Sequence, residues 1–348
     1  MSVYADLVAR ELATFAPEWD VELVQLLGAR EDAPGGRMTE RFIRVRKILV
    51  ARRLAEAVKA DVYHLLDGSF GYMVAGLPWA RTLVTVHDLI PALQAHGRFG
   101  VRPPGWAARR LIDSSLRVIA RAGSVCAVSR QTADDVLALT KRPVDAVIHS
   151  PLKNFPPIEV VGLECRSSDP PFVLHVGNNS FYKNRAGVLK VFAIMLRQRP
   201  ELRLVMAGPA PDGPLMKVMG EYQLGECVRF VTNPDDTELA DLYRRAVLFL
   251  FPSVYEGFGW PPLEAMHFGC PVVCSDAGSL PEVTGEAALR CPPDDIAGLA
   301  AAGLRILDDP ALASRLVKQG RDNLERFGSG QMAHALVTLY QRLAVGKT

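Results

Sequence analysis

The sequence has no long hydrophobic run and no targeting segment. Nowhere do eighteen apolar residues stand together, which excludes a membrane-spanning helix of ordinary length. The stretch from Met1 to Ala16 mixes acids and an arginine with apolar residues at helical intervals, which is typical neither of a signal peptide nor of a membrane span. We therefore expect a cytoplasmic protein, at most peripheral to the inner membrane.

A strong net charge is also absent. The 348 residues are 49% hydrophobic and 22% charged, with a formal net charge of +2, which excludes a dedicated nucleic-acid binder. Basic residues gather locally between Arg41 and Arg53 and between Arg98 and Arg121. These clusters are compatible with a solvated helix face, or with a surface for a membrane or an anionic substrate.

The cysteines lack the spacing of a metal or redox site. No CxxC pair and no histidine-rich segment occurs, and Cys270 and Cys274 flank a short strand-like segment without further ligands. We expect reduced thiols and no metal. The six cysteines are Cys126, Cys165, Cys227, Cys270, Cys274 and Cys291.

No GxGxxG motif is present, which excludes a nicotinamide or flavin enzyme built on the usual phosphate turn. The chain instead begins in a predicted helix, Tyr4–Phe15, where a Rossmann-type lobe normally has a strand and a glycine-rich turn. We therefore expect the first strand of the N-terminal lobe to be missing.

Short apolar runs alternate with amphipathic stretches in the first half, and the helices Phe42–Lys59 and Trp106–Arg121 are predicted between them. The pattern predicts a parallel sheet. Its expected strands are Val21–Leu27, Val62–Leu66, Thr82–Val86, Val125–Val128 and Ala146–Ile148.

The alternation breaks at a proline-rich connector and then restarts. We expect an N-terminal lobe over 1–155, a linker over 156–171, a C-terminal lobe over 172–330 and a closing helix over 331–348 that packs on either lobe. The predicted strands of the second lobe are Phe172–Val176, Leu202–Ala207, Val228–Val231, Val247–Phe251 and Val272–Cys274, with helices Asn184–Arg197, Thr237–Arg245 and Pro261–Phe268. Two doubly wound α/β lobes are expected, with a ligand between them at the carboxyl ends of the strands.

The stretch from Phe251 to Val273 contains the most informative pattern. A buried strand ends at Phe251, a glycine-bearing loop follows, and two prolines open a helix, so backbone N–H groups of Gly257 to Trp260 are placed to face an anion. Glu256 precedes this loop, and Glu264 lies one turn into the helix. A carboxylate repels a neighbouring diphosphate unless it accepts hydrogen bonds from hydroxyl groups. A nucleotide with a sugar therefore fits both the anion site and the two glutamates.

This stretch resembles the E-x7-E signature of the family 4 retaining glycosyltransferases (glycosyl transferases group 1), including the later segment from Gly278 to Val283. The resemblance implies the GT-B fold, with a C-terminal lobe that binds a nucleotide sugar. It also implies that Glu256 bonds the donor sugar, that Glu264 bonds the ribose, and that the loop backbone contacts sugar and phosphate. The implied loop residues are Gly257, Phe258 and Gly259.

A second segment, Val173 to Asn184, resembles the same family. It is a strand, a turn at Gly177 and Asn178, and then Lys183 and Asn184 opening a helix. An ammonium group at a helix N-terminus suits a diphosphate leaving group. The resemblance implies that role for Lys183, with the other three residues in donor binding.

The segment departs from the family pattern where an arginine usually precedes the lysine. Tyr182 occupies that position, and the next arginine is Arg185. Either phosphate neutralisation is weaker in this chain, or Arg185 supplies it.

In the first lobe, His87 and Asp88 follow a buried strand, in a His-Asp-Leu sequence that resembles bacterial mannosyltransferase-like members. The resemblance implies that His87 lies near the acceptor and the reacting sugar. Asp67 and Asp88 are weaker acceptor-side candidates. Ser129 is expected to cap a helix.

The implied reaction is the retaining, metal-independent and cofactor-free transfer of a hexose from an NDP-sugar, with GDP-mannose slightly favoured. The acceptor is a hydroxyl of a saccharide or of a lipid-linked saccharide. A glycosidase, a phosphorylase or epimerase, and a catalytically silent nucleotide-sugar-binding protein remain as alternatives.

Overall fold

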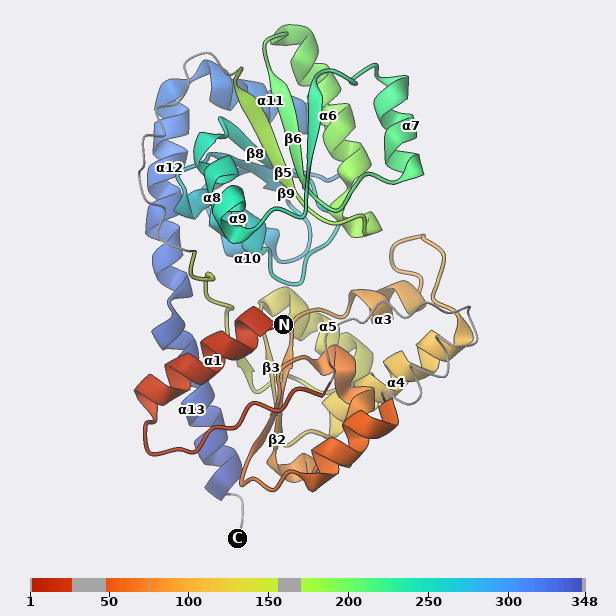
Figure 1. Ribbon diagram of the computed structural model, residues 1–348, viewed down its shortest axis with the longest axis vertical. Coiled ribbons are helices and arrows are strands. Elements are labelled where there is room, and N and C mark those ends of the chain that lie inside the picture. Colours follow the sequence, from red (N-terminus) through yellow and green to blue (C-terminus); the bar gives the residue numbers. More distant parts are fainter. Residues whose placement is uncertain (1, 27–47, 75, 156–169, 346–348) are drawn as a thin grey trace. The chain divides into compact units, whose positions relative to one another are not determined.

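The computed structural model describes residues 2–26, 48–74, 76–155 and 170–345. The chain divides into two compact units, one of Met1–Pro151 with Ser329–Thr348 and one of Leu152–Gly328 (Figure 1). Each unit has its own parallel sheet with helices packed on it, which confirms the predicted α/β class with two Rossmann-like lobes. Within the described ranges, no helix combines the length and hydropathy needed to cross a membrane.

The sheet of the first unit has the strand order β1-β2-β3-β4, and all neighbours pair in parallel. Four of the predicted strands are present: β2 and β3 are buried throughout, as their apolar runs predict, whereas β1 and β4 are short and only partly buried. Their bounds are β1 Tyr63–Leu65, β2 Thr82–Val86, β3 Ser124–Ala127 and β4 Ala146–Val147.

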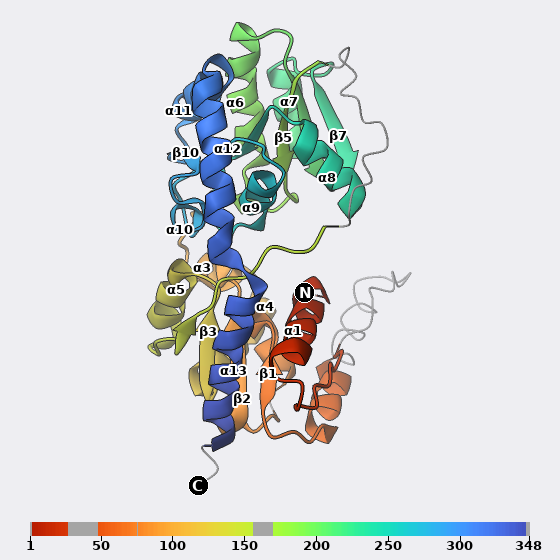
Figure 2. The same ribbon diagram turned by 90° about the vertical axis from the view of Figure 1, so that its left-hand side faces the viewer.

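Helices surround this sheet. The C-terminal helix α13 belongs to this unit, where it packs against α1 (Figure 2), and Tyr340 Oη lies 2.6 Å from His64 Nδ1 of β1. The helices are α1 Ser2–Phe15, residues 48–57, η1 Gly68–Met73, η2 Trp79–Arg81, α3 Ile90–Ala95, α4 Trp106–Arg121, α5 Arg130–Thr140 and α13 Ser329–Val345.

One predicted strand is wrong. Residues 21–25 of the expected strand Val21–Leu27 have no regular structure, and Val21, Leu23 and Val24 are exposed. An isolated β-prone run needs a neighbouring strand, and this one pairs with no described strand. Leu27 and residues 42–47 of the helix predicted over Phe42–Lys59 lie outside the described residues.

The sheet of the second unit has six parallel strands in the order β10-β9-β8-β5-β6-β7. Five of them match predicted strands. The sixth, β10, was missed because it is only half-buried and contains Arg290. The bounds are β5 Phe172–Val176, β6 Arg203–Gly208, β7 Val228–Thr232, β8 Leu248–Phe251, β9 Val272–Ser275 and β10 Ala288–Cys291.

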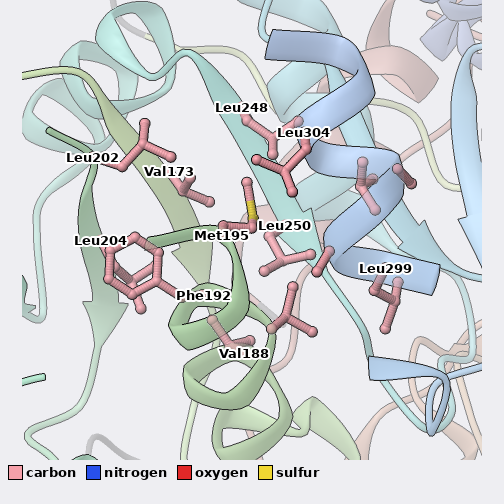
Figure 3. Close-up of a cluster of buried hydrophobic side chains, with 14 of the residues drawn as sticks. Val173, Val188, Phe192, Met195, Leu202, Leu204, Leu248, Leu250, Leu299 and Leu304 are labelled. Carbon is pink, nitrogen blue, oxygen red and sulfur yellow. The ribbon is translucent and has the colours of Figure 1, made fainter. Parts of the chain in front are cut away.

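A core between α6, α11 and the sheet holds this unit together (Figure 3). Val188, Phe192 and Met195 of α6 are fully buried with Leu248 of β8 and Leu299 of α11. Burying each such side chain contributes roughly 1.5–3 kcal/mol. The helices are η3 Phe181–Lys183, α6 Arg185–Gln198, α7 Gly213–Glu221, α8 Asp236–Arg245, α9 Trp260–His267, α10 Leu280–Thr284, α11 Ile296–Asp308, α12 Pro310–Leu324 and η4 Glu325–Phe327.

Candidate functional site

The strand order of the second unit reverses direction between β5 and β8. From β5 the chain proceeds outward through β6 and β7, and it then returns to β8 on the other side of β5. At such a reversal the loops after the two central strands turn away from each other, and ligands of open α/β sheets bind at the carboxyl ends there. The segments after β5 and β8 carry the residues predicted from both sequence motifs.

The turn after β5 is tightly packed. The Gly177 N–H donates to Ala207 O at 3.0 Å, and a Cβ at Gly177 would lie 2.8 Å from His175 Nε2. A Cβ at Gly208, where φ is +141°, would lie 2.2 Å from Gly177 O, so that position requires glycine. Asn178 Oδ1 accepts from Ser180 N at 3.0 Å, which fixes the turn in the conformation that leads to η3.

Asn184 joins three segments at the start of α6. It adopts a left-handed backbone conformation with φ 51°, and its Oδ1 accepts from Gly187 N at 3.1 Å as a helix cap. Its Nδ2 donates to Pro252 O at 2.9 Å and to Pro293 O at 3.2 Å. The side chain is thus engaged in holding the loop after β5 against the loop after β8, and a contact with donor stays a prediction.

Lys183 and Glu256 form an ion pair. Lys183 Nζ donates to both carboxylate oxygens of Glu256, at 2.8 and 3.0 Å, and the two side chains are 14% and 8% exposed. The loops that carry them are joined by a backbone hydrogen bond from Val254 N to Tyr182 O at 2.7 Å. The structure therefore brings together the lysine and the first glutamate that the two motifs singled out.

The loop of Glu256 rests on the turn before α10. Ser279 Oγ donates to Glu256 O at 3.1 Å and to Phe258 O at 2.5 Å. Gly278 has φ +61°, and a Cβ there would lie 2.6 Å from Glu256 O. The segment from Gly278 onward, matched from sequence, thus acts as the support of the glutamate loop.

Gly278→Ala is expected to destabilise the protein by about 2–3 kcal/mol, because the added Cβ meets backbone and the left-handed conformation is strained. Gly220→Ala is the control, since its Cβ meets nothing within 4 Å inside α7, and it is expected to stabilise by about 0.5–1 kcal/mol. Urea denaturation of both variants measures the difference. Equal stability of the two variants would show that the glutamate loop moves freely away from Gly278.

The glycine loop ends at Gly259, which caps α9 with φ +108°. A Cβ at Gly259 would lie 2.8 Å from Leu280 Cδ2, and prolines occupy the first turn of α9. The buried Phe258 ring packs edge-on against Phe327 at 5.7 Å between centroids. Gly257, between Glu256 and Phe258, is buried as well. The loop is therefore rigidly placed at the helix N-terminus.

Glu264 is buried in α9 beside partners that the sequence analysis did not single out. Tyr243 Oη donates to Glu264 Oε2 at 2.9 Å, and Lys153 Nζ lies 3.8 Å from Glu264 Oε1 and 2.6 Å from Asp236 Oδ1. Burial raises the pKa of Glu264, and Lys153 lowers it in part. Lys153 is distant in sequence from both motifs, so no local pattern marks it.

His175 was also missed. Its Nδ1 lies 3.0 Å from Leu250 O and must carry the proton, since a carbonyl only accepts. Its Nε2 is buried without a partner among the described atoms, beneath Gly177. Burial lowers the pKa of His175 to about 3, so the ring is neutral. A histidine within an apolar strand carries no distinctive sequence signal.

Arg185 is only 5% exposed. Its Nη1 donates to Pro209 O at 3.1 Å and to Asn179 Oδ1, while Nε and Nη2 are buried without a partner. The arginine thus braces the loops after β5 and β6. Whether its charge also serves a phosphate stays a prediction.

The predicted residues of the first unit follow the neighbouring strands β1 and β2, Asp67 after β1 and His87 and Asp88 after β2. His87 Nε2 lies 3.0 Å from Leu66 O, and Tyr4 packs edge-on against the ring at 4.7 Å. Burial lowers the pKa of His87, and the charge of Asp67 opposes this shift. Asp67 caps η1 through Ser69 N at 2.9 Å, and Asp88 accepts from Ile90 N at 3.0 Å. Both carboxylates therefore have structural bonds.

Ser129 caps α5 by accepting from Thr132 N at 3.0 Å, as expected. Among the residues that the structure describes, no group of three or more His, Cys, Asp or Glu side chains is arranged to hold a metal ion.

Comparisons with known proteins agree with the family resemblance and with the fold. A family model described as glycosyl transferases group 1 matches residues 165–323, which include both motifs. O-antigen chain mannosyltransferase B of Escherichia coli is 26% identical over 319 residues, 87% of this chain and 80% of that protein. Glycogen synthase of Mycobacterium tuberculosis is 35% identical over 158 residues, 44% of this chain and 38% of that protein. Among solved structures, sucrose-phosphate synthase from Thermosynechococcus elongatus superposes with a TM-score of 0.73 at 25% identity, covering 89% of this chain and 80% of that one.

Proposed function

We propose that this chain, which belongs to the group 1 glycosyltransferases and has their GT-B fold, transfers a hexose from an NDP-sugar to a hydroxyl of a saccharide or lipid-linked acceptor. Enzymes of this family transfer sugars, and the finer assignment rests on the site. The observation that carries it is the Lys183–Glu256 ion pair at the carboxyl ends of the two central strands.

The diphosphate is the part of the donor that needs positive charge. Lys183 supplies an ammonium group, and α6 and α9 begin directly after the two loops, so their N-termini add the positive ends of helix dipoles. These groups stabilise the charge that develops when the leaving group departs. We accordingly expect no metal ion and no cofactor in the reaction.

Donor binding is proposed to exchange the partners of the ion pair. A diphosphate competes with Glu256 for Lys183, because it offers more acceptor oxygens and more charge. The released carboxylate then accepts hydrogen bonds from hydroxyls of the sugar. After this exchange Lys183 binds the diphosphate, and Glu256 binds the sugar beside it.

Glu264 is proposed to accept a hydrogen bond from the ribose. Tyr243 and Lys153 hold its carboxylate from two sides, which fixes its orientation before the ligand arrives. A held acceptor loses less conformational entropy on binding than a free side chain does.

In the proposed reaction the bond between the anomeric carbon and the diphosphate oxygen breaks, and a bond to the acceptor oxygen forms on the same face. The acceptor proton passes to the departing phosphate oxygen. The Nε2 of His87 carries the proton toward Leu66 O, so its Nδ1 is left to accept a hydrogen bond from a hydroxyl, and the role of His87 near the acceptor stays a prediction.

A mannosyl donor is favoured over a glucosyl donor. Support comes from the His-Asp-Leu sequence at His87 and from the similarity to an O-antigen mannosyltransferase along most of the chain. We therefore propose GDP-mannose as the donor. The cytoplasmic location expected from sequence stays a prediction.

The nucleotide is tested by thermal unfolding with GDP, UDP, dTDP and ADP. At a concentration of about 100 times Kd, the matching diphosphate stabilises by about 2.7 kcal/mol, so GDP is expected to raise Tm by roughly 5–10 °C and the others by less. No shift with any nucleotide would sink the donor proposal, and a larger shift with UDP would reassign the base. GDP binding without mannosyl transfer to any acceptor would favour the silent binding protein.

A further inference from the structure

Helix α4 presents one face to solvent that carries a tryptophan and four arginines. Positions 106, 109, 110, 117 and 121 are spaced so that they lie along one side of a helix, and the single acid of α4, Asp113, is exposed on the same side. The opposite side is buried against η1, where Ser115 Oγ accepts from Tyr72 N at 3.2 Å and donates to Ser69 O at 2.9 Å. Contacts on the buried side thus fix which residues face outward, and α4 lies at the periphery of its unit (Figure 1).

The charge of this region is predominantly positive. Between Asp88 and Asp134 the sequence has seven arginines and a single acid, Asp113, although the whole chain has a formal net charge of only +2. A helix face that is merely solvated usually carries both signs, as α8 does with acids in its first turn and arginines in its last. The arginine excess on α4 therefore points to an anionic partner.

The arginines on this face are not neutralised. Among the described residues, no carboxylate forms an ion pair with Arg102 or with the four arginines of the α4 face, and none of the five is buried. The printed bonds of Arg109 and Arg117 go to the carbonyl oxygens of Ala95 and Asp113. A carbonyl leaves the positive charge of a guanidinium uncompensated.

Trp106 distinguishes between classes of anionic partner. The residue is 70% exposed at the first position of α4, next to this positive charge. A soluble polyanion satisfies the arginines and leaves the indole in water. A lipid interface interacts favourably with the arginines and with the indole, because indole rings partition to the headgroup level of membranes and anionic headgroups attract arginines.

We propose that the α4 face, formed by Trp106, Arg109, Arg110, Arg117 and Arg121 together with Arg102, docks onto a membrane surface of anionic phospholipids. Each arginine near such a surface raises affinity about fivefold. The docking surface lies in the first unit and does not depend on the identity of the sugar donor.

The test is sedimentation of the full chain with vesicles of phosphatidylcholine alone and of phosphatidylcholine with roughly one-third phosphatidylglycerol. Wild type is expected to bind the second kind, with an affinity that falls as salt rises. The double variant Arg109→Glu/Arg110→Glu is expected to lose at least about 25-fold in affinity, and Trp106→Ser to lose about tenfold.

The matched control is Arg315→Glu/Lys318→Glu, which makes the same charge change at exposed positions of α12. It is expected to bind vesicles like wild type, and thermal unfolding should be unchanged in all variants because the altered side chains are exposed. Equal losses in the control and the α4 variant would overturn the proposal. Failure of wild type to bind either kind of vesicle would also overturn it. If wild type then bound dextran sulfate, a soluble polyanion, the face would be assigned to a partner of that class.

Discussion

Lys183→Met is expected to lower turnover by a factor on the order of 10²–10³. The ammonium group lies just before α6 and bonds Glu256 in the loop that leads to α9, and its loss removes stabilisation that is greatest when the diphosphate departs. Release of nucleoside diphosphate from the sugar donor chosen by the nucleotide screen, in the presence of acceptor, measures the effect.

The control is Lys190→Met, which makes the same change at an exposed position of α6. Its turnover is expected to match wild type within roughly twofold, since the charge of an exposed side chain outside the site is screened by salt. Retention of near wild-type turnover by Lys183→Met would remove this lysine from the leaving-group role.

Glu256→Gln is expected to lower kcat/KM by a factor on the order of 10², because the amide is a weaker acceptor for sugar hydroxyls than a carboxylate. The variant should also lose about 3 kcal/mol of stability, since Lys183 is left largely buried without an opposite charge. Steady-state kinetics and urea denaturation measure the two effects. Glu226→Gln, an exposed residue of the same unit, is the control and is expected to change neither.

A double variant separates chemistry from folding. Lys183→Met/Glu256→Gln removes both charges, so its loss of stability should be smaller than the sum of the two single losses by roughly 1–3 kcal/mol. Its activity should stay at or below that of the weaker single variant. Recovery of activity together with stability would mean that the ion pair serves the fold and takes no part in transfer.

Regular elements were predictable where the local pattern is strong. Thr82–Val86, Phe172–Val176 and Trp106–Arg121 have the bounds expected from their apolar runs or helical periodicity. The prediction of a strand over Val21–Leu27 was wrong, because a β-prone segment forms a strand only beside a partner strand. The local sequence does not show whether such a partner is present.

Some residues of the candidate site were likewise predictable from the sequence, and others were not. Lys183, Glu256 and Glu264 stand in motifs whose residue types fit an anion and hydroxyls, so the sequence singled them out. Tyr243 and Lys153 reach Glu264 from separate segments, and the cap formed by Asn184 joins three loops. Such contacts form only when distant segments fold together.

The sequence by itself determined the alternation of strands and helices and the two motifs that follow buried strands. Only the tertiary structure decided that Lys183 and Glu256, 73 residues apart, meet as an ion pair. The reason is that β5 pairs with β8, although two strands intervene in the chain. Which strands become neighbours depends on how the helices cover both faces of the sheet, and that is a property of the packed unit as a whole.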